Sequence, residues 1–321
     1  MAADRDTYRI GGRLAATSRP VGFAVVASAY AAAGLAAWAV AAAWSGRHPL
    51  TVTFVADLVA TVVVFAASVA VANASLYDPY WSVAPAVIVV AWLLWTTGGD
   101  PAGITGRQTA VLLLVLAWSI RLTANWASSW RGLHHEDWRY VQLREQRPAR
   151  LPWWLINLSG IQLMPTLVVF AGLLAVWPAM TVTGRPWGLL DVAAVAVTGG
   201  AVLIEATADR QLHRFAGDPA NRGEIIDRGL WRYSRHPNYL GEIMFWWGMW
   251  LFGVAAAPDW WWTVLGPITM VLLFTFVSVP MMDRRSLVRR PAYAEHMNRV
   301  PALLPHPRRR PPAVAGGRAD G

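Results

Sequence analysis

Eight long apolar blocks constrain this chain more than any other feature of its sequence. They lie near residues 21–44, 51–72, 82–98, 108–126, 154–180, 187–207, 239–257 and 260–281. An α-helix needs about 17–25 apolar residues to cross the hydrocarbon core of a bilayer, and a helix satisfies its own backbone hydrogen bonds there. We therefore expect an all-α, polytopic integral membrane protein, a helical bundle of about seven to eight transmembrane helices.

Arginine residues indicate which side of the membrane each loop occupies. If the N-terminus lies inside, 24 of the 28 basic residues fall in inner segments, whereas the outer loops hold only Arg47, Arg107 and Arg185. Positive residues collect on the cytoplasmic side of membrane proteins, so we expect both termini to be cytoplasmic. The remaining basic residue, Arg121, lies inside the fourth apolar block, where a guanidinium is expected to be paired or functional.

The apolar blocks and loops suggest a simple domain organisation. We expect a cytoplasmic N-terminal segment over residues 1–20, one membrane domain over 21–305, and a disordered Pro/Arg-rich tail over 306–321. The chain has no cysteine and all its basic residues are arginine. Thiol catalysis, cysteine-ligated metals and lysine Schiff bases are therefore excluded. The net charge of +9 is better explained by inner loops facing anionic lipid headgroups than by nucleic acid, so membrane lipids are expected partners.

One polar cluster runs directly into the seventh apolar block. It extends from Arg232 to Glu242 and reads RYSRHPNYLGE. Pro237 suits the first turn of a helix, which would place Asn238 and Glu242 one turn apart on one face. The basic residues and tyrosine of this cluster have an alternative explanation as inner anchors and an interfacial aromatic. A carboxylate in the first turns of a span is rare unless it is paired or binds a polar group.

Two further clusters lie at inner ends of spans. Glu205 and Asp209 are four positions apart at the inner end of the sixth block, and Arg121 and Asn125 have the same spacing in the fourth. The run from Trp130 to Tyr140 contains two adjacent histidines, but neighbours on a helix point roughly 100° apart, so we expect no metal. The sequence has no Gly-x-Ser-x-Gly elbow, Rossmann fingerprint or P-loop, so a nucleotide would have to be held by side chains between helices.

The residues from Gly229 to Glu242 resemble the C-terminal signature of the steroid 5-alpha-reductase family. The chain most resembles a bacterial branch of membrane proteins that share the Tyr-Asp-Pro-Tyr-Trp-Ser run at 77–82, the run ending at Tyr140 and the Val-Pro-Ala-Leu-Leu-Pro run at 300–305. The resemblance covers most of residues 73–305, with the signature region at about 187–305. It places the protein in a bacterial inner (plasma) membrane.

This resemblance implies an enzyme that uses NADPH to reduce the carbon–carbon double bond of an enone lipid or steroid-like substrate. Hydride goes to the beta carbon while a polar side chain polarises the carbonyl. Asn238 and Glu242 match the family's Asn-x-x-x-Glu, which holds the nicotinamide end, and Asp209 matches an acidic residue on the adenosine side; Glu242 is also a catalytic candidate. The other cofactor-binding candidates are Arg121, Asn125, Arg139, Tyr140, Arg232, Tyr233, Arg235, His236 and Tyr239, with Arg235 a candidate for the 2′-phosphate.

The chain departs from the steroid-reducing members in its second span. Those members place a Glu there, ahead of a Tyr further along, to hold the steroid ketone, whereas this span offers only Asp57 among Val and Ala residues, with no matching motif. These residues therefore do not imply steroid specificity. Asp78 and Tyr80 are substitute catalytic candidates, because a tyrosine hydroxyl can donate a hydrogen bond to a developing enolate oxygen.

Two other functions stay open. Membrane methyltransferases of the isoprenylcysteine carboxyl methyltransferase type carry a similar Arg-His-Pro-x-Tyr-x-Gly run and bind S-adenosylmethionine, although Asn238, Asp209 and the 136–140 run look more like the reductase branch. A non-catalytic lipid binder or transporter would place polar residues near the bilayer midplane, where only Asp57, Arg121 and Asn125 qualify.

Overall fold

The computed structural model describes residues 17–304, which form helices and contain no β-strand within that range. Seven helical stretches are long and apolar enough to cross a membrane: Arg19–Ala43, Pro49–Ala70, Ala74–Thr97, Gly106–Ser129, Trp153–Thr181, Leu189–Gly217 and Pro258–Arg289. They confirm the prediction of an all-α, polytopic integral membrane protein. Most of the expected segment 1–20 and all of the expected tail 306–321 lie outside the described residues.

The seventh expected span, 239–257, corresponds to helix α9 (Pro237–Ala256), which is not among the seven helical stretches above. Its polar residues Asn238 and Glu242 lie in the first two turns of the helix. Cytoplasmic placement of both termini requires an even number of spans and stays a prediction.

The chain divides into two compact units. Unit 1 comprises residues 1–199 and 246–270, and unit 2 comprises 200–245 and 271–321. The boundaries fall inside three helices, which are α8 (Leu189–Gly217), α9 and α10 (Leu265–Leu273). The domain expected over 21–305 is thus subdivided, and each unit contains polar clusters that are described below.

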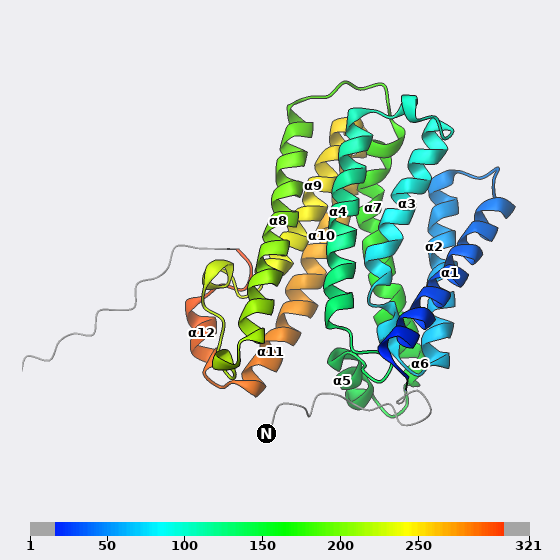
Figure 1. Ribbon diagram of the computed structural model, residues 1–321. Helices are drawn as coiled ribbons and strands as arrows, with labels where there is room; N and C mark the ends of the chain where they lie inside the picture. The colour runs from blue at the N-terminus through cyan, green and yellow to red at the C-terminus, as the bar shows by residue number, and fades with distance from the viewer. Residues whose placement is uncertain (1–16, 305–321) are drawn as a thin grey trace, which may run out of the picture. The chain divides into compact units, whose positions relative to one another are not determined.

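Unit 1 is organised around helix α7 (Met164–Thr181). This helix packs against α2 (Pro49–Ala70), α3 (Tyr80–Thr97) and α4 (Gly106–Ser129), while α1 (Arg19–Ala43) packs against α2 (Figure 1). Close approach is possible at Gly172 of α7, where an added Cβ would lie 2.3 Å from the Trp246 ring. Small residues let helices in a membrane approach closely, since hydrophobic association is weak there.

The N-terminal part of α3 begins earlier than its apolar block. Residues Ala74–Tyr77 form a short 3-10 helix, η2, which leads into α3, and together they make the span Ala74–Thr97. The Asn73 side chain caps η2 by accepting a hydrogen bond from the Ser75 backbone N–H at 2.9 Å. The loop expected over 73–81 is therefore mostly helical, and Tyr77, Asp78 and Tyr80 lie within the helical stretch Ala74–Thr97. A satisfied cap lets the chain start the helix before its most apolar residues.

Shorter helices complete unit 1. They are η3 (Pro101–Gly103), α5 (Trp138–Gln146), α6 (Trp153–Ile156), the π-helix η4 (Asn157–Leu163) and η7 (Pro258–Val264). A buried ion pair joins the starts of α4 and α8, where Arg107 donates to both carboxylate oxygens of Asp191 at 2.6 and 2.9 Å. Arg107 also donates to the backbone oxygens of Arg185 and Pro186, so its charge is well compensated despite burial.

Unit 2 contains the later part of α8, the first part of α9, and the helices α11 (Val279–Arg289) and α12 (Tyr293–Arg299). Its remaining short elements are η5 (Pro219–Asn221), η6 (Gly229–Arg232) and the π-helix η8 (Phe274–Ser278). Helix α9 lies very close to α8 at Gly241, where an added Cβ would be 2.4 Å from Glu205 Cγ. This contact brings the polar ends of α8 and α9 together.

Candidate functional site

A buried carboxyl and a buried tyrosine hydroxyl meet within the helices of unit 1. Asp57, in the middle of α2, is 7% exposed, and Tyr80, at the start of α3, is 6% exposed. The Tyr80 hydroxyl donates a hydrogen bond to Asp57 Oδ1 at 2.7 Å. A carboxyl group inside a membrane span is costly and usually paired or functional. The structure thus supplies Asp57 with the tyrosine partner that no sequence motif indicated.

Three more hydroxyl groups surround this acid–tyrosine pair. The Thr61 hydroxyl donates to the Asp57 backbone oxygen at 2.8 Å and lies 3.0 Å from the Thr166 hydroxyl. The Tyr77 hydroxyl lies 2.8 Å from the same Thr166 oxygen. Tyr77 and Tyr80 belong to an apolar cluster with α1 and α2 residues, so these hydroxyls are surrounded by hydrocarbon. The hydroxyl groups therefore form a buried polar cluster with apolar residues around it.

Asp78, the other carbonyl-polarising candidate, is bound by a residue from the predicted cofactor set. The Tyr140 hydroxyl donates to Asp78 Oδ1, while Arg139 donates to both oxygens of Asp137 at 2.8 and 3.1 Å. Burial, together with the nearby Asp78 carboxylate, raises the pKa of Tyr140 well above its usual value. Tyr140 therefore remains a hydrogen-bond donor. The structure brings Asp78, Arg139 and Tyr140 together, but Asp78 already has a donor in Tyr140.

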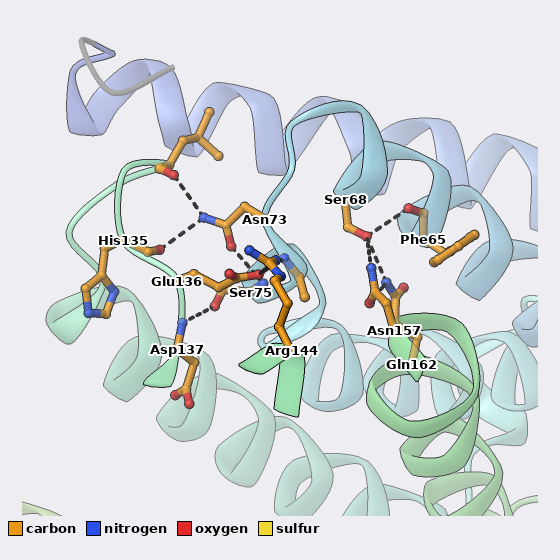
Figure 2. A network of polar contacts seen from close by, with 12 residues as sticks. Phe65, Ser68, Asn73, Ser75, His135, Glu136, Asp137, Arg144, Asn157 and Gln162 are labelled. Atoms are coloured by element: carbon orange, nitrogen blue, oxygen red, sulfur yellow. Dashed lines mark hydrogen bonds and ion pairs between the residues drawn. The ribbon is translucent and has the colours of Figure 1, made fainter. Parts of the chain in front are cut away.

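The loop before α5 is fastened to η2 by a polar network (Figure 2). Asn73 Nδ2 donates to the backbone oxygens of Leu133 and His135, both at 3.0 Å. Glu136 accepts hydrogen bonds from the Ala74 backbone N–H at 2.9 Å and from Arg144 at 2.8 Å. Burial raises the pKa of Glu136, although the Ala74 N–H and Arg144 oppose that shift.

This network accounts for much of the charged run ending at Tyr140. Its polar residues position the start of α3, which carries Tyr80. Sequence reasoning missed Asn73 because an isolated asparagine after an apolar block carries no motif. Among residues 17–304, no group of three or more His, Asp or Glu side chains has the arrangement of a metal site.

A second polar contact in unit 1 joins α2 to the π-helix η4, and Figure 2 shows its side chains converging. Asn157 Nδ2 and Gln162 Nε2 donate to Ser68 Oγ at 3.3 and 2.9 Å, and Gln162 Nε2 also lies 3.0 Å from Asn157 Oδ1. All three residues are buried. Sequence reasoning missed this cluster, although π-helical turns often mark functional sites.

Arg121 and Asn125 lie one turn apart on α4, as their spacing predicted. Both side chains are half-buried. The Asn125 backbone oxygen accepts hydrogen bonds from Ser128 and Ser129 at 2.8 and 3.2 Å.

In unit 2, the predicted cofactor residues of α8 and α9 converge. Asn238 Nδ2 donates to Asp209 Oδ1 at 3.4 Å, and the two residues are 29 positions apart in the sequence. Glu205, one turn before Asp209 in α8, and Glu242, one turn after Asn238 in α9, are both buried. The close packing at Gly241 places these side chains on facing helices. The resemblance named Asp209, Asn238 and Glu242 separately, and the fold makes them one acidic cluster.

Arg235 and His236 contact the C-terminal segment of unit 2. Arg235 donates to Asp283 at 3.3 and 2.7 Å and to the backbone oxygens of Met297 and Val300 at 3.3 and 2.6 Å. His236 Nε2 lies 2.9 Å from Asp283 Oδ1. The Arg235 side chain is 9% exposed. These contacts indicate that Arg235 and His236, through Asp283 and the backbone of residues 297 and 300, hold the C-terminal segment in place; we call this arrangement the clamp. It is a structural role, in place of the predicted contact of Arg235 with a 2′-phosphate.

The other predicted contacts of this motif differ in exposure. Arg232 and Tyr233 are exposed next to each other, with the guanidinium carbon 5.3 Å from the tyrosine ring centre. Tyr239 is half-buried and stacks on His236, with ring centres 5.3 Å apart. Arg232 and Tyr233 are therefore accessible to a ligand, whereas His236 is part of the clamp.

Comparison with known proteins places the chain in a family. A family model described as "Protein of unknown function (DUF1295)" matches residues 64–300. An uncharacterised protein of the fission yeast Schizosaccharomyces pombe is 25% identical over 281 residues, which is 80% of each chain. No solved structure matches this chain. Because the family model covers well over half of the sequence, including Tyr80 and the acidic cluster of unit 2, the chain belongs to the DUF1295 family.

Proposed function

We propose that this protein is a membrane-embedded, NADPH-dependent reductase of the carbon–carbon double bond in a hydrophobic enone. The Tyr80–Asp57 hydrogen bond is the observation that carries the proposal. It pairs an acid of the second span with a tyrosine later in the chain. The steroid-reducing members use such a combination to hold the steroid ketone, and no sequence motif indicated it in this chain. The family supports the proposal too, since DUF1295 is a membrane family related to steroid 5-alpha-reductase-like proteins.

The pair suits the stabilisation of a developing enolate. When Asp57 carries a proton, it donates to the Tyr80 oxygen and leaves the phenol hydrogen to point at a substrate carbonyl. A donor aimed at the oxygen where charge develops is worth more in an apolar, water-excluded site than in water. Tyr30 packs edge-on against the Tyr80 ring, with ring centres 5.8 Å apart, and holds that ring in place.

The donor set of unit 2 fits the uncharged portions of NADPH. The Asn238 amide offers both a donor and an acceptor, and the carboxylates of Asp209 and Glu242 accept hydrogen bonds from ribose hydroxyls or amide groups. Phosphate groups require cations, and the exposed Arg210, Arg214 and Arg232 suit them better than the clamped Arg235. The hydride for the beta carbon would come from bound NADPH.

Ligand binding and turnover of purified protein test this proposal. We expect NADPH to raise the melting temperature of detergent-purified protein, because a ligand that binds only the folded state stabilises it. Stabilisation by S-adenosylmethionine alone would instead indicate the methyltransferase.

Variants then test the acid–tyrosine pair. Tyr80→Phe and Asp57→Asn should each lower enone reduction by about 10²-fold or more while leaving NADPH binding unchanged. Tyr30→Phe is the matched control, since its hydroxyl donates only to the Leu76 backbone oxygen among the described contacts and not to the acid. Wild-type turnover in Tyr80→Phe would remove the pair from the reaction.

A further inference from the structure

The acid–tyrosine pair is the end of a longer row of hydroxyl groups. The Thr61 and Tyr80 hydroxyls both donate to the Asp57 backbone oxygen, at 2.8 and 3.2 Å, and the Thr61 hydroxyl lies 3.0 Å from the Thr166 hydroxyl. Thr166 also lies 2.9 Å from the Gln162 backbone oxygen. Each threonine hydroxyl thus has more than one neighbouring oxygen, and it can rotate to donate to any of them. A hydroxyl that can both accept and donate is able to pass a proton along such a row.

Through Gln162, the row of hydroxyl groups continues toward the buried polar contact of Ser68 with Asn157 and Gln162. Gln162 and Thr166 are four residues apart and therefore share one face of the helix that α7 continues from η4. Gln162 Oε1 is buried and accepts no hydrogen bond from any residue between 17 and 304. Buried carbonyl acceptors are nearly always satisfied, often by an internal water with several polar neighbours. A water held by Gln162 would connect Thr166 to Ser68 and Asn157, near the end of α2 that the arginine pattern assigns to the cytoplasm.

The proposed reaction, on which this inference rests, needs such a route. A bound reduced nicotinamide would supply the hydride for the beta carbon, and Tyr80 would pass its phenol proton to the enolate oxygen that results. The resulting tyrosinate must regain a proton before the next cycle, and the enol returns to the ketone when the alpha carbon takes up a proton and the oxygen releases one. Each turnover thus consumes one hydride and one proton. Hydrocarbon around Tyr80 holds no bulk water to supply that proton.

We propose that Thr61 and Thr166, with a water held by Gln162, form a proton path from the Ser68–Asn157 end of α2 to Tyr80. Thr61 and Thr166 then have a function beyond packing α2 against α7. Thr61 and Thr166 are fully or almost fully buried and belong to different helices. The path therefore requires α2 and α7 to stay packed against each other at these two residues.

Exchange of the Tyr80 hydroxyl proton with solvent tests the path without substrate or cofactor. Full-length protein in lipid nanodiscs is transferred rapidly to D₂O, and the C–O–H infrared band of Tyr80 is isolated by subtracting the spectrum of a Tyr80→Phe partner for each variant. We expect Thr166→Val and Gln162→Leu to slow this exchange by about tenfold or more. Thr166→Ser should restore the wild-type rate, because it returns the hydroxyl.

The control is Thr198→Val in unit 1. Thr198 is fully buried and donates to the Ala194 backbone oxygen at 2.7 Å, as Thr61 does to Asp57, but it is not part of the row. If Thr166→Val fails to fold, Thr61→Val interrupts the row from α2 instead. A wild-type exchange rate in folded Thr166→Val or Thr61→Val would overturn the proton path. Slow exchange in a protein that reduces no enone would keep the path and reject the reductase, so the two failures are distinguishable.

Discussion

Replacing Arg235 by alanine distinguishes a structural clamp from a phosphate contact. The guanidinium makes two hydrogen bonds to Asp283 and two to backbone oxygens of the C-terminal segment. Removing one partner of a buried ion pair typically costs about 3–5 kcal/mol, because the other charge is left uncompensated. Here His236 and Tyr293 still contact Asp283, which favours the lower end of that range. We therefore expect a loss of about 3 kcal/mol in the free energy of unfolding.

The assay compares thermal stability with cofactor affinity. A loss of this size should lower the melting temperature by several degrees in a chain of this length. Because the whole C-terminal segment loosens, any change in NADPH affinity should be matched by an equal change in NADH affinity. Arg235→Lys is the informative companion, since it keeps the charge but cannot reproduce the bidentate geometry, and it should be destabilised as well. Wild-type stability in Arg235→Ala combined with a selective loss of NADPH binding would refute the clamp and restore the 2′-phosphate assignment.

Two further predictions concern unit 2. Gly241→Ala should lower the free energy of unfolding by about 1–3 kcal/mol and weaken cofactor binding, because the new Cβ would approach Glu205 Cγ to 2.4 Å and the Ala201 backbone oxygen to 3.0 Å. Gly34→Ala, which meets nothing within 4 Å, is the control in the same unfolding and binding measurements, and equal behaviour of the two variants would contradict the close packing of α8 and α9. Burial lowers the pKa of His296 below its ordinary 6.5, so its contribution to stability is complete above pH 6.5 and is lost as the pH falls through the lowered pKa. As the pH falls below 6.5, the melting temperature should therefore decrease more steeply in wild type than in His296→Gln. Parallel pH profiles of the two melting temperatures would exclude the histidine as the cause.

The clamp also changes how the Arg-His-Pro-Asn motif is understood. Its arginine and histidine hold the segment that includes α12, and its asparagine contacts Asp209 of α8. One short motif thus connects the C-terminal segment to the acidic cluster. A loosened segment would disturb the position of Asn238 without any direct ligand contact being lost.

Sequence patterns determined the class of fold because the bilayer limits the choices. Seven long apolar helices follow from the apolar blocks alone, since a spanning segment must satisfy its own backbone. The prediction was weaker at the ends of spans: α9 forms a helix that is not among the seven, and the helical stretch that contains α3 starts at a cap provided by Asn73. Caps and single polar residues act locally and are invisible to hydropathy.

Residue types and spacing also indicated which side chains carry chemistry, but not which of them meet. Asn238 and Glu242 lie one turn apart on a helix, as their separation requires, whereas Asp209 joins them only because α8 and α9 pack closely at Gly241. Asp57 and Tyr80 are 23 residues apart, and their hydrogen bond exists because α3 returns alongside α2. The sequence by itself determined a helical membrane protein with polar residues at particular turns. Only the tertiary structure decided that Asp57 has a tyrosine partner and that Arg235 is part of a clamp, because both depend on contacts between helices that no local pattern encodes.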